Sequence, residues 1–270
     1  MKPLLLVFIA ALLLLPGIIF YSGKKQEDRR ARENVVRLQT YAQDQSDRIY
    51  RKDQIADLPV PVQRYFRNVL REGQPYVSSV TLKHDGQFKT GVGKEWIDIQ
   101  GEQYFTVDEP GFLWRGKTSL FSVRDMYIAG EGRLVVSLFS LFKVADGRGA
   151  TYNQGELLRW LGESVWFPTN LLPSHRLQWE PIDENTARLL FHHRGMFLDY
   201  TVRFNQNGEI TELETERYMG DDRLETWVGR VSDYEEVGGM KIPMRIEAIW
   251  KLEEGDHSYA RFQVTEIHHD

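Results

Sequence analysis

The sequence predicts an α+β protein: one strongly curved antiparallel sheet of about eleven strands with a single firm helix, which we call the plug helix. Three observations support this. Apolar and polar residues alternate along most of the chain after Tyr76, which is the period of strands with one buried face. Short turns rich in glycine separate these segments, so neighbouring strands run antiparallel. Residues 155–168 instead have helical spacing. An apolar N-terminal stretch adds a transmembrane helix to this fold class.

The N-terminal stretch, residues 4–21, is uncharged and almost wholly apolar. About 18 such residues are near the minimum that spans the ~30 Å hydrocarbon core of a bilayer. The sequence Phe20-Tyr21-Ser22-Gly23 lacks the pair of small residues that marks a signal-peptide cleavage site. We therefore expect an uncleaved signal-anchor over residues 1–23.

Basic residues on both sides of this stretch leave its orientation open. Lys2 precedes it, and a larger cluster follows it: Lys24, Lys25, Arg29, Arg30 and Arg32. The positive-inside rule alone would keep the following domain in the cytoplasm, whereas a very short leader before a long domain favours export. We expect a single-pass protein of the cytoplasmic membrane, with the extracytoplasmic side slightly favoured for the domain.

Residues 24–54 are polar and charged, which predicts a helical stalk. Its apolar positions have coiled-coil spacing but cover only two heptads with a central glutamine: Val35, Leu38, Ala42, Gln45 and Ile49. Two heptads are too few for a coiled coil, so we expect the stalk helix to rest on its own domain.

The β-rich domain occupies residues 55–270 and begins with a short helix. Pro61 suits the first turn of a helix that runs through Leu70, and its apolar residues should pack against the sheet. Strands before the plug helix are expected at 77–89, 94–107, 112–119, 121–129 and 133–142. Strands after it are expected at 177–181, 186–193, 196–205, 209–219, 224–235, 240–252 and 258–267.

Composition excludes several classes of function. The chain has no cysteine, which rules out disulfides, thiolate metal sites and cysteine nucleophiles. The net charge of -5 gives no basic footprint for nucleic acid. The histidines have no metal-ligand spacing, and the adjacent His192 and His193 should point to opposite faces of a strand. The glycine-rich turns match no phosphate-binding fingerprint. We expect neither a metal nor a cofactor.

The plug helix, ended by Pro168, has two faces. Leu157, Leu158, Leu161 and Val165 share one, and Glu156, Arg159 and Glu163 share the other, with Trp160 near the polar side. A charge ladder on a solvated helix surface would explain the polar face at little cost. Alternatively, this face lies at the mouth of the curved sheet, where Trp160 and Trp166 form apolar walls and Arg159 binds a carboxylate or phosphate.

Three strand residues, Asp125, Tyr127 and Arg217, could line the same concave face, although a buried salt bridge would also explain them. The candidate ligand-binding residues are therefore Glu156, Arg159, Trp160, Glu163, Trp166, Asp125, Tyr127 and Arg217.

Several short motifs carry a family resemblance: Leu58-Pro59-Val60-Pro61, His84-Asp85-Gly86, Asp125-Met126-Tyr127, Gly155–Glu163 and Gly239–Pro243. Together they resemble a bacterial family known only as a domain of unknown function, many of whose members carry an N-terminal membrane segment. The resemblance covers about residues 55–268. The closing strands are also similar to the lipoprotein-carrier (LolA-like) fold. That similarity implies a half-open barrel whose concave side, plugged by helices, holds acyl chains.

These observations favour a membrane-anchored, non-enzymatic protein that shelters an apolar ligand, a lipid or lipoprotein acyl chain, in its concave sheet. Two alternatives remain. The first is an envelope scaffold or protein-interaction module. The second is a hydrolase that uses Glu156 and Glu163 as acid and base. The sequence does not identify the ligand, a protein partner or the oligomeric state.

Overall fold

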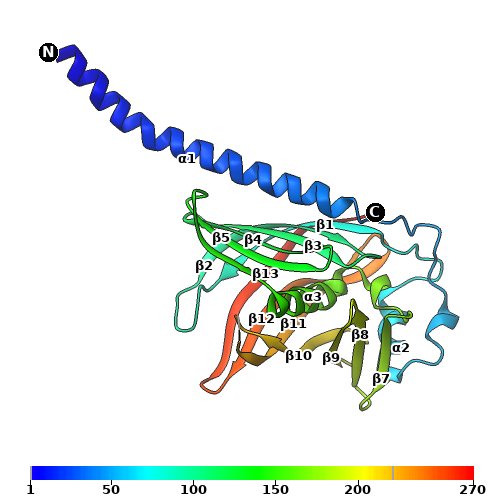
Figure 1. The fold of residues 1–270 in the computed structure, drawn as a ribbon. Helices are drawn as coiled ribbons and strands as arrows, with labels where there is room; N and C mark the ends of the chain where they lie inside the picture. Colours follow the sequence, from blue (N-terminus) through cyan, green and yellow to red (C-terminus); the bar gives the residue numbers. More distant parts are fainter. Residues whose placement is uncertain (1, 221) are drawn as a thin grey trace.

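A computed structural model describes the backbone of residues 2–220 and 222–270 and the side chains of residues 21–220 and 222–270 (Figure 1). Its helices are α1 (Lys2–Gln39), α2 (Val60–Val69) and α3 (Ala150–Glu163), with 3-10 turns η1 (Lys52–Ile55), η2 (Ser164–Trp166) and η3 (Pro168–Leu171). The described strands are β1 (Ser79–Phe88), β2 (Ile97–Thr106), β3 (Gly111–Lys117), β4 (Phe121–Ile128), β5 (Glu131–Leu138), β6 (Phe142–Arg148), β7 (Leu177–Pro181), β8 (Thr186–His193), β9 (Met196–Phe204), β10 (Ile210–Tyr218), β11 (Leu224–Val237), β12 (Met240–Leu252) and β13 (Gly255–His269).

All of these strands belong to one antiparallel sheet, in the order β6-β5-β4-β3-β2-β1-β13-β12-β11-β10-β9-β8-β7. The first and last strands of the domain, β1 and β13, pair at its centre. Within the described chain, the outer strands β6 and β7 do not pair with each other, so the barrel stays open. The helix α3 connects these two edges and contacts strands of both halves, β3–β6 and β9–β10. The predicted curved antiparallel sheet with a plug helix is therefore present.

The expected number of about eleven strands is too low, since the described residues form thirteen. The twelve ranges predicted from the sequence each correspond to one strand, so the count of eleven is one short of them, and the strand outside all twelve is β6 (Phe142–Arg148). It is an edge strand with both faces largely exposed, so it has no apolar alternation for a sequence pattern to reveal. The plug helix also begins earlier than expected, at Ala150, directly after Gly149, whose φ is 116°.

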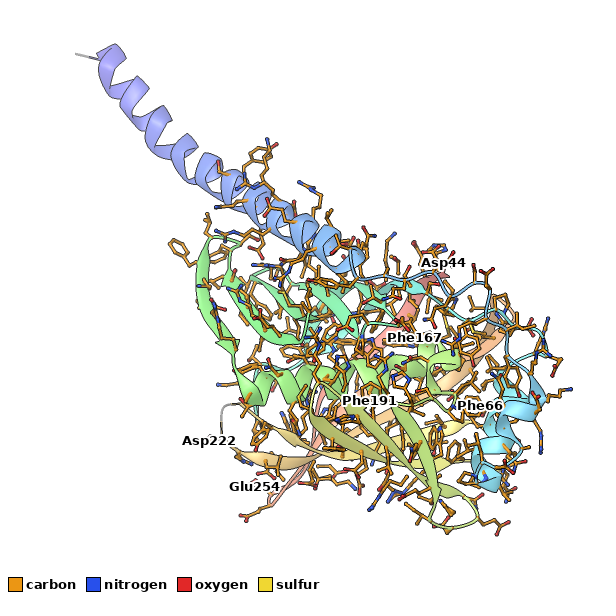
Figure 2. The ribbon with its side chains drawn as sticks, turned by 45° about the vertical axis from the view of Figure 1, so that its right-hand side comes forward. Asp44, Phe66, Phe167, Phe191, Asp222 and Glu254 are labelled. Carbon is orange, nitrogen blue, oxygen red and sulfur yellow. The ribbon has the colours of Figure 1, made fainter. Side chains whose placement is uncertain are left out.

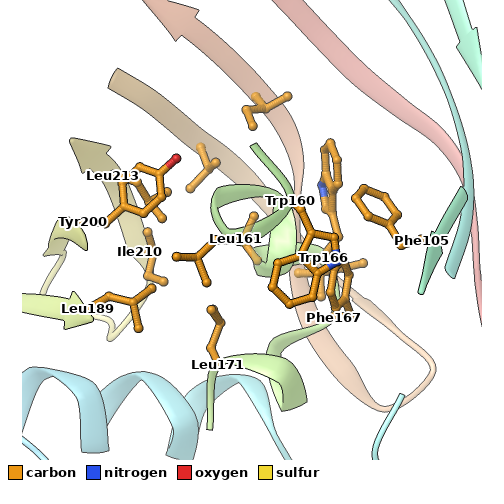
Figure 3. Close-up of a cluster of buried hydrophobic side chains, with 14 of the residues drawn as sticks. Phe105, Trp160, Leu161, Trp166, Phe167, Leu171, Leu189, Tyr200, Ile210 and Leu213 are labelled. Carbon is orange, nitrogen blue, oxygen red and sulfur yellow. The ribbon is translucent and has the colours of Figure 1, made fainter. Parts of the chain in front are cut away.

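The core lies between α3 and the two halves of the sheet. Figure 3 shows Trp160, Leu161 and Phe167 packed with side chains from several strands, among them Leu189 and Leu213. Figure 2 places Phe167 and Phe191 in the interior, whereas Asp44, Asp222 and Glu254 lie at the periphery. The predicted apolar face of α2 is buried in the same core: Val62, Tyr65, Phe66 and Val69.

The C-terminal half of α1 packs against the outer face of β2, β3 and β4. Glu27 accepts a hydrogen bond from Arg124 Nε at 2.5 Å, and Asp28 pairs with Arg115. Leu38 is buried in a small apolar cluster on this face. The helix ends at Gln39, so the last three positions of the predicted seam do not lie on it: Ala42, Gln45 and Ile49.

Within the part of the chain whose side chains the structure describes, no helix is long and apolar enough to cross a membrane. The predicted anchor depends on residues 4–21, which lie, apart from Tyr21, outside the residues whose side chains are described.

Candidate functional site

A pocket with a volume of about 270 Å³ lies between α3 and the concave face of the sheet. Its walls are mainly apolar and aromatic, and its floor carries charged side chains from α3, β4 and β10. The lining residues that matter below are Trp114, Asp125, Glu156, Arg159, Glu163, Arg217, Trp227, Trp250, Tyr259 and Phe262. An apolar pocket with a few converging polar groups is the usual form of a small-molecule site.

Arg159 is the centre of the charged floor. Its Nη1 donates to Asp125 Oδ2 at 2.6 Å, and its Nε donates to Glu163 Oε1 at 3.0 Å. Gln103 donates to the other oxygen of Glu163 at 2.5 Å. The side chains of Arg159, Asp125 and Glu163 are only 12%, 9% and 8% exposed. The charges of α3 therefore do not form a solvated surface ladder, because they are enclosed by the sheet.

Glu156 lies beside the carboxylate of Asp125, and its nearest cation, Arg217, is 3.7 Å away. Burial, followed by the charge of Asp125, raises the pKa of Glu156 well above its usual range. Within the described structure, Asp125 Oδ1 and Glu156 Oε2 are both buried and receive no hydrogen bond from a donor group. A hydrogen bond between the two carboxyls contributes to the raised pKa. A proton on Glu156 removes the repulsion between the two like charges and lets this carboxyl donate a hydrogen bond to Asp125.

Arg217 is held less tightly than Arg159. Its Nη2 lies 3.7 Å from Glu156 Oε2, beyond hydrogen-bond distance, and its guanidinium lies 5.6 Å from the ring centre of Trp227. Gly155 makes room for it, since a Cβ at that position would lie 3.3 Å from Arg217 Nε. Because a guanidinium has five N–H donors, Arg217 keeps donor groups for a ligand.

One wall of the pocket is fixed from behind by a buried histidine. Trp114 Nε1 donates to His84 Nε2 at 2.7 Å, and the His84 ring stacks on Phe262 with a centroid distance of 4.1 Å. Burial lowers the pKa of His84 to about 4. The neutral imidazole therefore serves as an acceptor that orients the Trp114 ring.

The structure brings together five of the eight candidate residues around the pocket: Asp125, Glu156, Arg159, Glu163 and Arg217. The other three do not line it. Trp160 Nε1 donates to Thr106 O and Trp166 Nε1 donates to Pro243 O, each at 2.9 Å and inside the core. Tyr127 is fully buried beside His193.

Sequence reasoning missed the aromatic wall supplied by the last three strands, which includes Trp227, Trp250, Tyr259 and Phe262. It also missed Gln103, which holds Glu163. Tryptophan and tyrosine on closely spaced, long strands were the available signal. Among the described side chains, no group of three or more His, Asp or Glu residues could hold a metal ion.

Replacing Glu156 with glutamine should flatten the pH dependence of stability at neutral and alkaline pH. In the unfolded chain this carboxyl loses its proton near pH 4.5, whereas the folded protein retains it. The unfolded state then binds fewer protons, so the free energy of unfolding of the wild type falls as pH rises, by at most about 1.4 kcal/mol per pH unit. Urea denaturation between about pH 6.5 and 9, above the range of the buried histidines, measures this slope.

The control for this experiment is Glu236→Gln, since Glu236 is 61% exposed and pairs with Arg71 at the surface. Equal slopes in Glu156→Gln and Glu236→Gln would contradict a proton held between Asp125 and Glu156.

Comparison with known proteins gives one family and several distant structures. The family of unknown function DUF6544 matches residues 48–262. None of the curated proteins matches the sequence. Similar solved structures include a LolA superfamily protein from Nitrosomonas europaea, with 14% identity and a TM-score of 0.42, covering 77% of this chain and 90% of that one.

Two further similar structures have comparable scores. A domain assigned to outer membrane lipoprotein sorting, from Vibrio parahaemolyticus, has 9% identity and a TM-score of 0.41, covering 71% of this chain and 85% of that one. A DUF1329 family protein from Desulfovibrio piger has 10% identity and a TM-score of 0.42, covering 72% of this chain and 86% of that one. The predicted resemblances to a family of unknown function and to LolA-like proteins are thus both found. Likeness at this level concerns the outline of the fold and carries no statement about function.

Proposed function

We propose that this chain, which belongs to the family of unknown function DUF6544, binds an amphipathic ligand with an acyl tail in the pocket between α3 and the sheet. The observation that supports this most directly is the pocket itself, an aromatic cavity of about 270 Å³ with a floor of buried charges. A solidly packed interior would have left no place for such a ligand. Its size is close to the lower end of the range for small-molecule sites.

The ligand's head group binds Arg217 in this proposal. Arg159 is already committed to Asp125 and Glu163. Among the described side chains, Glu156 is the acidic group that pairs with Arg217. When the Glu156 carboxyl is protonated and neutral, the guanidinium loses this nearest carboxylate and keeps only the weaker influence of Asp125. A carboxylate or phosphate matches the planar guanidinium through paired hydrogen bonds.

The tail extends along the aromatic wall formed by Trp227, Trp250, Tyr259 and Phe262. Burying an acyl chain there stabilises the complex by about 0.8 kcal/mol per methylene group. The N-terminal anchor predicted from the sequence would tether the pocket near a bilayer, which supplies such ligands.

Replacing Arg217 with methionine should weaken binding of a dansyl-labelled fatty acid by roughly 10- to 100-fold, the loss expected for a charged hydrogen bond. Methionine keeps much of the apolar volume, so binding of the corresponding dansyl-labelled fatty alcohol should change little. Fluorescence titration of the detergent-free protein with both probes measures the difference.

Arg223→Met is the matched control, because Arg223 is 52% exposed and pairs only with surface groups in the described structure. Equal losses of affinity for the fatty acid and the fatty alcohol would show that Arg217 does not bind the carboxylate head group. Native mass spectrometry of detergent-free protein should also reveal co-purifying lipid. If neither bound lipid nor probe binding is found, the proposed function is wrong.

Hydrolysis is the second candidate, because Glu156 and Glu163 line the same pocket and burial raises the pKa of both carboxyls. Both oxygens of Glu163 are engaged by Gln103 and Arg159, which leaves Glu156 as the carboxyl able to donate a proton. Turnover of a dansyl-labelled acyl ester that Glu156→Gln abolishes would favour hydrolysis. Binding of the ester without turnover would favour carriage.

A further inference from the structure

An exposed apolar surface lies on two neighbouring turns, outside the residues that line the pocket. We call it the apolar tip; it consists of Leu120 in the β3–β4 turn and Leu138, Phe139, Phe142 and Val144 around the β5–β6 turn. Their exposed fractions are 52%, 36%, 42%, 63% and 61%. The backbone N–H of Phe139 donates to Leu120 O at 2.8 Å, so the two turns form one continuous surface.

The β5–β6 turn adopts a conformation that its residues disfavour. Phe139 and Ser140 have φ values of 50° and 58°, and Leu141 N donates to Leu138 O at 3.0 Å across them. Tight hairpin turns of this kind usually place asparagine or glycine at the left-handed positions. A phenylalanine there costs of order 1 kcal/mol or more, and with 42% of its surface exposed it recovers little of this by burial.

The apolar tip lies beside α1 where the predicted anchor ends. In Figure 1 the turn between β5 and β6 lies close to α1. A Cβ at Gly23 would overlap the Leu141 side chain and come within 3.1 Å of Ser140 O, so glycine permits this contact. With a helical rise of about 1.5 Å per residue, Gly23 lies only about 3 Å along the axis from Tyr21, the last residue of the apolar stretch. The Tyr21 side chain is 68% exposed.

The charge around the apolar tip suits an anionic surface. The two turn segments, residues 118–122 and 137–145, contain no acidic residue and include Lys143, which pairs with Asp146. Arg133 and Arg148 pair with the same carboxylate, so this cluster keeps an excess of positive charge. Lys24 and Lys25 follow Tyr21 on α1 and are exposed. Aromatic residues flanked by lysines are typical of the interface between lipid and water.

We propose that the apolar tip inserts into the interfacial layer of the bilayer that holds residues 4–21. The domain would then contact the membrane at two points, the predicted anchor and the tip, with the ends of β3–β6 directed toward the lipid. This inference rests on the predicted anchor and is independent of what the pocket binds.

The absence of cysteine allows a direct test by single labels. Phe142→Cys and Leu120→Cys, each carrying an NBD fluorophore, are prepared as full-length chains in vesicles of phosphatidylethanolamine and phosphatidylglycerol. We expect a blue-shifted emission and a several-fold loss of intensity when phosphatidylcholine brominated on its acyl chains is added to the vesicles. Both positions are exposed, so the labels should not disturb folding.

Phe197→Cys is the matched control. Phe197 is 83% exposed, and its hairpin lies at the opposite end of β4 and β5, where Arg194 packs near Gly130. Its label should remain unquenched. A blue shift at Phe142 and Leu120 without quenching by brominated lipid would indicate a protein partner and overturn the proposal. Equal quenching at Phe197, or a full-length chain that does not float with the vesicles, would overturn it as well.

Discussion

Replacing Arg159 with alanine is expected to lower the free energy of unfolding by about 3–5 kcal/mol, the cost of breaking a buried ion pair from one side. The substitution leaves Asp125 and Glu163 buried without their main cation, 9% and 8% exposed. It also removes the guanidinium from between the rings of Phe112 and Trp114, at 5.1 and 4.9 Å. Urea denaturation at neutral pH measures the loss.

Arg261→Ala is the control for this prediction. Arg261 also pairs with a carboxylate and lies 4.5 Å from the ring centre of Trp96, but it is 51% exposed. Exposed pairs of this kind contribute about 1 kcal/mol or less. A loss below about 1 kcal/mol in Arg159→Ala would mean that water reaches the floor of the pocket.

The triple variant Asp125→Asn, Arg159→Met, Glu163→Gln separates stability from function. Replacing these three charges together should recover much of the stability lost in Arg159→Ala, because no carboxylate is then left buried without Arg159 as its partner. If this variant is stable but no longer binds the ligand, the charged cluster serves ligand binding and is not needed for stability.

Most of the fold could be predicted from the sequence because the two strands of each hairpin are neighbours in the sequence. A marker such as Asn207-Gly208 and the alternation on both sides of it fix a pair of strands without knowledge of the rest. The pairing of β1 with β13 is different. It joins residues nearly two hundred positions apart, such as Val80 and His269, and no local pattern contains it.

The charged half of the candidate site could be predicted because Glu156, Arg159 and Glu163 share one face of a single helix. The aromatic half could not, since Trp227 and Phe262 lie on strands where aromatic residues are ordinary. They reach the pocket only through the long-range order of the sheet.

The helical wheel also assigned Trp160 to the polar side. That assignment assumes that a helix has one solvent-exposed face and one buried face. The sheet surrounds α3, so its apolar face meets the core, its charged face meets the pocket, and Trp160 is buried between them.

Replacing Trp160 with alanine should cost about 3–5 kcal/mol, the range for truncating a large buried aromatic residue. The side chain is 1% exposed and packs against Phe191 at a centroid distance of 5.6 Å. The loss also leaves the Thr106 carbonyl without the hydrogen bond from Trp160 Nε1. The midpoint of urea denaturation should therefore fall well below that of the wild type.

Trp96→Ala is the matched tryptophan control, and it should cost about 1 kcal/mol or less, because Trp96 is only partly buried and lies between the side chains of Lys89 and Arg261. The variant Trp160→Phe tests whether Trp160 acts only in the core or also in ligand binding. It keeps most of the buried volume, so the protein should fold and lose about 1–3 kcal/mol with the unsatisfied carbonyl. Because Trp160 does not line the pocket, fatty acid affinity should be unchanged in Trp160→Phe. If this folded variant lost affinity for the fatty acid, Trp160 would take part in ligand binding. That result would contradict our assignment of Trp160 to the core and not to the pocket.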